Sequence, residues 1–434
     1  MASRGNFSIS LAVAVAAVLT GPLHAQSITP QDAAALPSMR TTIPMEENPA
    51  IGYFELPTTD RVATLIDQID KGMVDFGAEG PSGFLKGLLA ALDVSVESQV
   101  LVFSKTSMQR QFIDAKTPRA LFFGDDIVVA YIPEAPLIEI AVQDPRQGMV
   151  FYTLDQESRR LPLIERRSEC AGCHISSASM SVPGALNRSV ATREDGTAMP
   201  MIANSVVDHR TPAAERWGGH YVTGIAGGDH IGNRALANNS DATEMRPLGA
   251  PEQAVDLSGY ISAKSEAAAL LVLDHQVNMM NLITRIGWDA RVGDDYVRQQ
   301  KIPGGVRDTL IKSDAREFVD YLLFVDEAAL PGKVSPSTFA DEFAKRGPRD
   351  KKGRSLYDLD LSTRLMRYPC SYLIYSAAFD GLPAPAKEAV YARLWDVLAG
   401  KDRDRKYSRL SARDRKAIAE ILKDTKPGLP AYFK

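Results

Sequence analysis

Residues 137–155 read LIEIAVQDPRQGMVFYTLD, and this stretch decides the fold. Two runs rich in branched and aromatic residues flank the segment DPRQG at 144–148, whose composition is typical of a tight turn. The stretch therefore predicts a β-hairpin. The runs VLVFSK at 100–105 and ALFFGDDIVVAYI at 120–132 have the same composition, so we expect them to add strands and complete a small, mostly antiparallel sheet.

Helical patterns lie on both sides of this sheet region. Apolar residues recur at helical spacing in 60–72, and 84–92 is a second short helix candidate. Ser313 and Ser411 are placed as N-caps of later helices. The helices predicted beyond residue 256 span 260–286, 313–327, 336–345, 385–399 and 411–422. The pattern indicates an α+β protein whose C-terminal part is a helical layer.

Residues 166–250 separate the two patterns and are dense in glycine, proline, serine and asparagine. They predict loops rather than regular structure, and loops of this length in a compact protein usually serve a site. We therefore expect a mixed α/β region over 26–165, a loop-rich binding region over 166–250 and a helical region over 251–434.

The N-terminus has the pattern of a secretory signal. Arg4 precedes the apolar run LAVAVAAVLT at 11–20, and a small-residue cleavage site follows it, with cleavage expected after Ala25. A membrane anchor is the alternative, but about ten apolar residues cannot cross a bilayer that requires roughly 20. Residues 1–25 therefore predict a cleaved signal and a periplasmic or secreted protein.

Charge and composition exclude other classes of partner. The chain has 50 basic and 54 acidic residues, a formal net charge of −4, and no long block of either sign. A nucleic-acid partner is therefore disfavoured. No later segment is apolar enough for a membrane span, and the composition leaves the oligomeric state open.

The sequence RRSECAGCHISS contains Cys170, Cys173 and His174 in the order C-x-x-C-H. Two thiols separated by two residues lie one helical turn apart and can form thioethers with the two vinyl groups of one porphyrin. The histidine that follows then lies beneath the iron as an axial ligand. The motif predicts one covalently attached haem c, and the export signal agrees with it because attachment takes place outside the cytoplasm.

Two other readings of the cysteines remain open. Cys170 and Cys173 could form a disulfide or a redox-active dithiol, although no thioredoxin-like pattern surrounds them. A structural zinc completed by His209, His220 or His230 is the second reading, but the spacings match no common zinc site. The third cysteine, Cys370, is flanked by apolar residues and is expected to be a buried structural thiol.

The CAGCH motif resembles that of the c-type cytochromes. The stretches PRALFFGDDIVVAYIP, GMVFYTLDQ, PGALNRSV, ERWGGHYVTG and YPCSYLIYS are similar to a group of exported single-haem bacterial proteins. The resemblance implies a haem inside a larger unit than a small electron carrier, without a specific activity. In that pattern an aromatic residue often replaces His220, so the resemblance does not make His220 an essential ligand.

The second axial position of the iron has several candidates. His230 lies in GIAGGDHIGN, where glycines let the backbone approach a flat ligand, and it ranks first. His275 shares a helical face with apolar residues and is expected to point inward, either as a distal ligand or as a core histidine with a backbone partner. Met199 or Met201 ranks third, and a loop hydrogen bond is expected for His209.

Haem propionates favour arginine partners because the guanidinium group is always charged and binds carboxylates in a bidentate way. We expect at least one arginine near the motif to serve in this role. The candidates are Arg159, Arg160, Arg166, Arg167, Arg188 and Arg216.

Three functions follow from these observations. The first is electron transfer with a periplasmic partner by a six-coordinate haem. The second is a haem enzyme, such as a haem-dependent oxidoreductase acting on a small molecule, or a small-ligand binder, in which His230 or His275 acts from the distal side. The third is a haem-based sensor or scaffold subunit. The sequence favours a redox haem protein, with electron transfer as the named activity.

Overall fold

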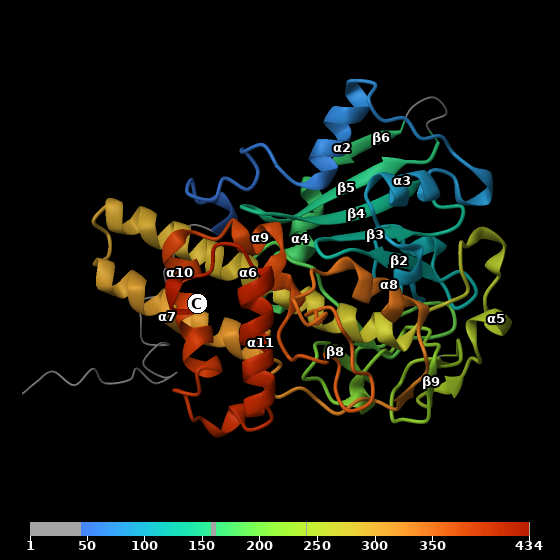
Figure 1. The fold of residues 1–434 in the computed structure, drawn as a ribbon. Coiled ribbons are helices and arrows are strands. Elements are labelled where there is room, and N and C mark those ends of the chain that lie inside the picture. The colour runs from blue at the N-terminus through green and yellow to red at the C-terminus, as the bar shows by residue number, and fades with distance from the viewer. Residues whose placement is uncertain (1–44, 158–161, 240, 434) are drawn as a thin grey trace, which may run out of the picture. The chain divides into compact units, whose positions relative to one another are not determined.

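The centre of the molecule is one antiparallel sheet of six strands in simple chain order (Figure 1). The computed structural model describes residues 45–157, 162–239 and 241–433. The strands are β1 (Val100–Val102), β2 (Arg119–Phe123), β3 (Ile127–Tyr131), β4 (Leu137–Asp144), β5 (Gly148–Asp155) and β6 (Leu163–Arg166). The predicted hairpin is confirmed, because β4 and β5 pair along their whole length.

The turn of this hairpin has a clear physical cause. The Asp144 carboxylate accepts hydrogen bonds from the backbone N–H groups of Arg146 and Gln147, as a side chain that caps its own turn does. Gly148 has a φ of 84°, and a Cβ atom there would lie 2.4 Å from a methyl carbon of Thr284. Only glycine fits both the conformation and the space.

The two faces of the sheet are covered to different degrees. On one face, side chains such as Ile138, Ile140 and Val142 are completely buried in a core shared with α2 (Arg61–Asp70) and α3 (Leu85–Ala91). On the other face, alternate residues of β2 and β4 are only half-buried, as is Val128 of β3. This second face packs against the larger core of the helical part.

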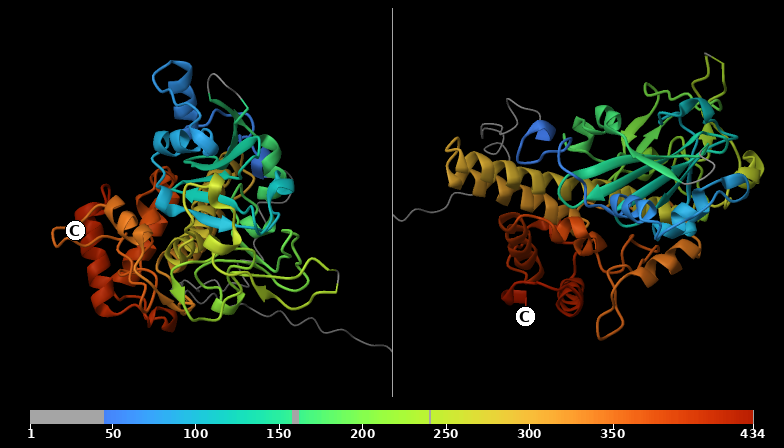
Figure 2. Two further views of the ribbon diagram at one scale, coloured as in Figure 1. Left: turned by 90° about the vertical axis from the view of Figure 1, so that its right-hand side faces the viewer. Right: turned by 90° about the horizontal axis from the view of Figure 1, so that it is seen from above.

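The long helix α6 (Ala267–Arg298) joins the sheet to the C-terminal helices. In the view from above in Figure 2, it lies between the sheet and helices α10 and α11. Gln143 donates to the Met280 carbonyl from the sheet side. Within the described residues, the other helices of more than four residues are α7 (Gly304–Leu322), α8 (Thr338–Arg346), α10 (Ala384–Leu398) and α11 (Ala412–Thr425). The α+β class and its helical C-terminal layer are confirmed.

Helix boundaries show where local signals succeed and fail. Ser411 is the N-cap of α11, as predicted, and it forms a reciprocal capping box with Asp414. The prediction that Ser313 is an N-cap is wrong. It lies inside α7, which begins directly after Pro303, where extended backbone turns into helix. The helix expected over 260–286 begins at Ala267 instead, because Thr223 pairs with the extended backbone of Glu266 and bonds the backbone groups of Ser265 and Ala267.

Residues 166–250 form loops and short elements, as the composition predicted. The longest helix of their described part has four residues. The short elements in and directly after the segment are α4 (Ala171–His174), β7 (Arg188–Val190), β8 (Asn204–Val206), β9 (Ile225–Ala226), β10 (Arg234–Ala235), β11 (Arg246–Pro247) and α5 (Pro251–Ala254). β12 (Lys333–Val334) pairs with β9, and α9 (Ala377–Asp380) is a short helix of the C-terminal part.

The described residues all belong to one compact unit. The predicted signal over 1–25 lies outside the described residues, as does most of the arm that follows it. Within the described part of the chain, no helix combines the length and the hydropathy that a bilayer crossing requires.

Candidate functional site

The C-x-x-C-H segment forms a helical turn directly after the last strand of the sheet. Residues 168–170 form a 3-10 turn that continues into α4. Cys170 is half-buried and Cys173 is exposed, and neither is part of a disulfide. Because side chains three positions apart in a helix share one face, both thiols are available on the same side of the turn.

The turn is fastened to its surroundings from two sides. The Arg167 backbone N–H donates to the Phe151 carbonyl on β5, and its side-chain Nε donates to Thr153 Oγ1 at 2.8 Å. Ala171 is buried in a small apolar cluster with Trp288 of α6. The attachment segment therefore has a fixed position against both the sheet and α6.

His174 has one ring nitrogen fixed and the other free. Its Nδ1 lies 2.8 Å from the Gly184 carbonyl oxygen, an acceptor that requires the ring proton on Nδ1. Nε2 makes no hydrogen bond within the described residues and therefore carries the lone pair that a metal needs. Burial lowers the pKa of His174, and the Gly184 carbonyl partly opposes this, so the ring is neutral near pH 7. The ring packs against Phe151, with 4.5 Å between centroids.

The loop after His174 closes back on this histidine. The Gly184 N–H and the Ser179 hydroxyl both donate to the His174 carbonyl. A Cβ atom on Gly184 would lie 2.3 Å from Oδ1 of Asn281, and Asn281 on α6 donates to the carbonyl of Ala185. Helix α6 therefore sets the position of the carbonyl that orients the His174 ring.

The sheet face beside this segment is incompletely covered, and part of it is apolar. Leu121 on β2, Val128 on β3 and Ala141 on β4 are half-buried side chains of this face. The register places Val128 and Ala141 in one row with Phe151. Cys170 belongs to the same apolar cluster. A flat apolar group attached at Cys170 and Cys173 would cover surface that the described side chains leave partly exposed. The residues present therefore fit a covalent haem.

The thiol chemistry disfavours the dithiol reading. Burial, followed by the negative charges of Glu169 and Glu139, raises the pKa of the Cys170 thiol to about 11. Catalytic dithiols have the opposite property, a pKa lowered by positive surroundings. Cys370 is completely buried, as predicted.

A zinc site held by protein side chains alone has no counterpart in the described ranges. Among residues 45–157, 162–239 and 241–433, no three His, Cys, Asp or Glu side chains are grouped closely enough to hold a metal ion. A haem iron needs only one or two protein ligands, so this finding does not bear on the haem prediction.

His275 points inward, as predicted, but both of its ring nitrogens are engaged. Nδ1 lies 2.8 Å from Nδ1 of His209, and Nε2 lies 2.8 Å from the hydroxyl of Ser371. The ring stacks on Phe324 and Tyr321. Burial lowers the pKa of His209 and of His275 well below the ordinary value. These contacts give His275 a structural role in the helical core.

His230 is half-buried and packs edge-on against Trp217. Its Nδ1 accepts a hydrogen bond from the backbone N–H of Gly232 at 3.2 Å, which places the proton of the neutral ring on Nε2. Iron ligation through Nε2 therefore requires this contact to open. Of the methionine candidates, Met199 is half-buried and Met201 is 95 % exposed.

The arginines named from sequence are engaged elsewhere in the described structure. Arg166 donates to the Tyr53 carbonyl and to Gln147. Arg188 donates to Asn204 and Arg216 pairs with buried Asp274. Arg167 bonds Thr153 and Glu165, and Arg159 and Arg160 lie outside the described residues.

Sequence reasoning missed two features of the site. The first is the Gly184 carbonyl, for which the only sequence signal is a glycine ten residues after the histidine. The second is the pair Arg119 and Glu139 on the half-exposed sheet face, with 3.5 Å between Nη1 and Oε2. Charged residues at alternate positions of otherwise apolar strands were the signal that could have indicated this pair.

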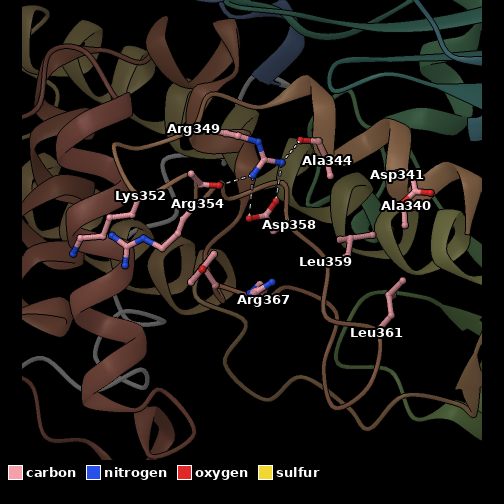
Figure 3. A pocket seen from close by; sticks show the side chains of 12 residues that line it. Ala340, Asp341, Ala344, Arg349, Lys352, Arg354, Asp358, Leu359, Leu361 and Arg367 are labelled. Carbon is pink, nitrogen blue, oxygen red and sulfur yellow. Dashed lines mark hydrogen bonds and ion pairs between the residues drawn. The ribbon is translucent and has the colours of Figure 1, made fainter. Parts of the chain in front are cut away.

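A cavity of about 390 Å³ lies elsewhere, between α8 and the segment that follows it (Figure 3). Arg349 reaches across it to Asp358 at 3.0 Å, and Arg354 bonds Asp350 and Glu420. None of the residues predicted to bind haem lines this cavity.

No family model, curated protein or solved structure matches the chain. The functional conclusion therefore depends on the motif and on the geometry around it.

Proposed function

We propose that the chain is an exported redox protein that carries one haem c on Cys170 and Cys173, with His174 as proximal ligand, and that it transfers single electrons. The observation that carries the proposal is the fixed ring of His174. A C-x-x-C-H sequence in a helical turn provides the thiols and the histidine, and the Gly184 carbonyl provides the second hydrogen bond that an iron-ligating imidazole requires.

A bound haem supplies one-electron chemistry at its iron. The chain's own residues perform three tasks around it. Cys170 and Cys173 would fix one edge of the group, His174 would offer Nε2 to the iron, and the half-buried apolar side chains of Leu121, Val128 and Ala141 would exclude water from one surface. A donated Nδ1–H also raises the basicity of the ligating nitrogen.

The distal side decides between electron transfer and a second candidate, a small-ligand binder or haem enzyme. His230 stays the first distal candidate, with one weak backbone contact to give up. The engagement of His275 supports the second candidate. Hydrogen bonds occupy both of its ring nitrogens, so His275 is not free to be the sixth ligand, and fewer side chains remain that could close the distal position of the iron.

Optical spectra with and without carbon monoxide separate these functions. The wild-type protein, His230→Gln and His275→Gln are expressed with a c-type haem maturation system and reduced. For a carrier with His230 on the iron, we expect the wild type to be indifferent to carbon monoxide and His230→Gln to bind it rapidly.

His275→Gln is the matched control, since it removes an imidazole of equal size that lies in the core, and we expect it to behave as the wild type. Rapid carbon monoxide binding by the wild type would contradict the six-coordinate carrier and support the ligand-binding alternative.

A further inference from the structure

Arg119 is a charged side chain on the half-exposed sheet face whose hydrogen-bonding capacity is largely unused. Its side chain is 14 % exposed. Its two contacts are long, 3.5 Å from Nη1 to Oε2 of Glu139 and 3.4 Å from Nη2 to Oγ1 of Thr106. Within the described part of the chain its buried Nε has no hydrogen-bond partner. A guanidinium group has five N–H donors, so most of them remain available.

Glu139 does not saturate this guanidinium group because other residues hold its carboxylate. Ser107 donates its hydroxyl to Oε1 at 2.6 Å, and Gln109 Nε2 lies 3.3 Å from the same oxygen. The contact with Arg119 is longer than both. An unpaired buried donor is costly, which indicates that a further acceptor belongs here.

Strand register places this unused donor next to the attachment site. Glu139 on β4 lies directly opposite Thr153 on β5, whose hydroxyl binds the side chain of Arg167. Phe151, two residues earlier on the same face, packs against His174. The Arg119 charge also lowers the pKa of His174, after burial as the main cause.

His220 borders the other side of Arg119. Val102 pairs with Arg119 in one direction and with His220 in the other, so the three side chains share one face of the sheet. Burial lowers the pKa of His220 to about 4, and Nδ1 bonds the Gly218 carbonyl. A neutral imidazole does not neutralise the guanidinium group, so Glu139 is the only carboxylate in ion-pair contact with it among the described residues.

We propose that Arg119 binds a carboxylate on this sheet face, supplied in the assembled protein by a haem propionate. This inference rests on the proposed haem site. Arginine binds carboxylates in a bidentate way, and the sequence-named arginines within the described residues already have partners. A free small carboxylate is a second source with the same chemistry.

Thermal unfolding in two backgrounds tests the assignment without reference to activity. Arg119→Gln and Arg119→Lys are made in the haem-loaded protein and in the Cys170→Ser/Cys173→Ser protein, which lacks covalent haem. Each is unfolded with and without sodium acetate. The control is Arg346→Gln, whose side chain is 25 % exposed and lies 3.4 Å from Asp125, in a pair that contains neither Arg119 nor Glu139.

If a propionate is the partner, Arg119→Gln lowers the unfolding midpoint by about 2–4 °C more in the loaded protein than in the apo background. Arg119→Lys recovers part of this loss, and Arg346→Gln shows equal changes in both backgrounds. If the carboxylate is free, acetate raises the midpoint of the apo protein and Arg119→Gln abolishes that rise.

Equal losses in both backgrounds without an acetate effect would overturn the inference. A wild-type protein without covalent haem would instead refute the proposed function, while the acetate comparison would still test Arg119.

Discussion

His174 and His275 both pack against aromatic rings, but His174 is half-buried and His275 is completely buried. His174 has one fixed nitrogen, one free nitrogen and a half-covered apolar face beside it. His275 has hydrogen bonds on both nitrogens and no exposed surface. His174 therefore keeps one nitrogen available for the iron ligation that we propose, whereas His275 does not.

Helix α6 links the two regions. Three consecutive buried polar residues in its N-terminal third bind other parts of the chain. Asp274 binds Arg216 and His275 binds His209 of the same loop, while Gln276 bonds the Gly124 carbonyl and the Tyr372 hydroxyl. Two turns later, Asn281 restricts the position of Gly184 beside the attachment site. The helix therefore uses one set of side chains for cohesion and another for the orientation of His174.

The largest effect is expected at the buried ion pair beside His275. Arg216 bonds the His209 carbonyl as well as Asp274. Arg216→Ala leaves a buried carboxylate unpaired and should reduce the free energy of unfolding by about 3–5 kcal/mol, measured by urea denaturation. Arg210→Ala, which removes a half-exposed partner of Asp208, should cost less than about 1 kcal/mol. Equal losses of stability in the two variants would show that burial of the Arg216–Asp274 pair does not increase its contribution.

The second prediction is that acid lowers the free energy of unfolding, because several buried histidines are neutral in the folded protein. The folded-state pKa values of His209, His275 and His220 lie below the unfolded value, so the unfolded chain binds protons that the folded chain does not. Stability is therefore lost as the pH falls below about 6.5, and for His220 the loss continues to a pH of about 4.

Buried carboxyl groups act in the opposite sense, because burial raises the pKa values of Asp60, Asp126 and Glu327 as well as that of Asp274. Burial raises the pKa of Asp274 to about 7, so this carboxyl gains protons on folding and offsets one histidine over the same range. Urea denaturation across this range measures the sum, and a stability that is constant or rises with acid would contradict it.

A smaller effect is expected at the carbonyl that orients His174. Gly184→Ala introduces a methyl group where Asn281 leaves no room, and overpacking of this kind costs about 1–3 kcal/mol. Nitrogen-15 NMR of the His174 ring should show loss of the single Nδ1–H tautomer. Gly172→Ala is the matched control, because nothing lies within 4 Å of its added methyl group. An unchanged tautomer in Gly184→Ala would show that the position of the Gly184 carbonyl does not determine the tautomer of His174.

The smallest effect is expected for His174 itself in the protein without haem. In the Cys170→Ser/Cys173→Ser background, His174→Ala loses one hydrogen bond at a half-buried site and should change the free energy of unfolding by about 1 kcal/mol. His275→Ala in the same background loses two buried hydrogen bonds and leaves a cavity, at a cost of about 2–4 kcal/mol. A larger loss of stability for His174→Ala than for His275→Ala in urea denaturation would contradict the structural role of His275.

Local patterns predicted the sheet and most helices because strand alternation, turn composition and the Ser411 cap are short-range signals. They failed at Ser313 and at the start of α6, where Pro303 and the pairing with Thr223 decide the boundary. The attachment motif is also local, so its helical turn was predictable.

Contacts between distant residues were not predictable. His209 meets His275 across 66 residues, and Asn281 approaches Gly184 only because α6 crosses the loop. The inward direction of His275 followed from its helical face, whereas its two partners depend on tertiary packing.

The most direct test of the central claim is the intact mass of the wild-type protein after expression with a c-type maturation system and denaturation. The expected result is one added haem that maps to the peptide containing Cys170 and Cys173, is retained in Cys370→Ser and is lost in Cys170→Ser/Cys173→Ser. A polypeptide of unmodified mass, or haem retained without both thiols, would contradict it.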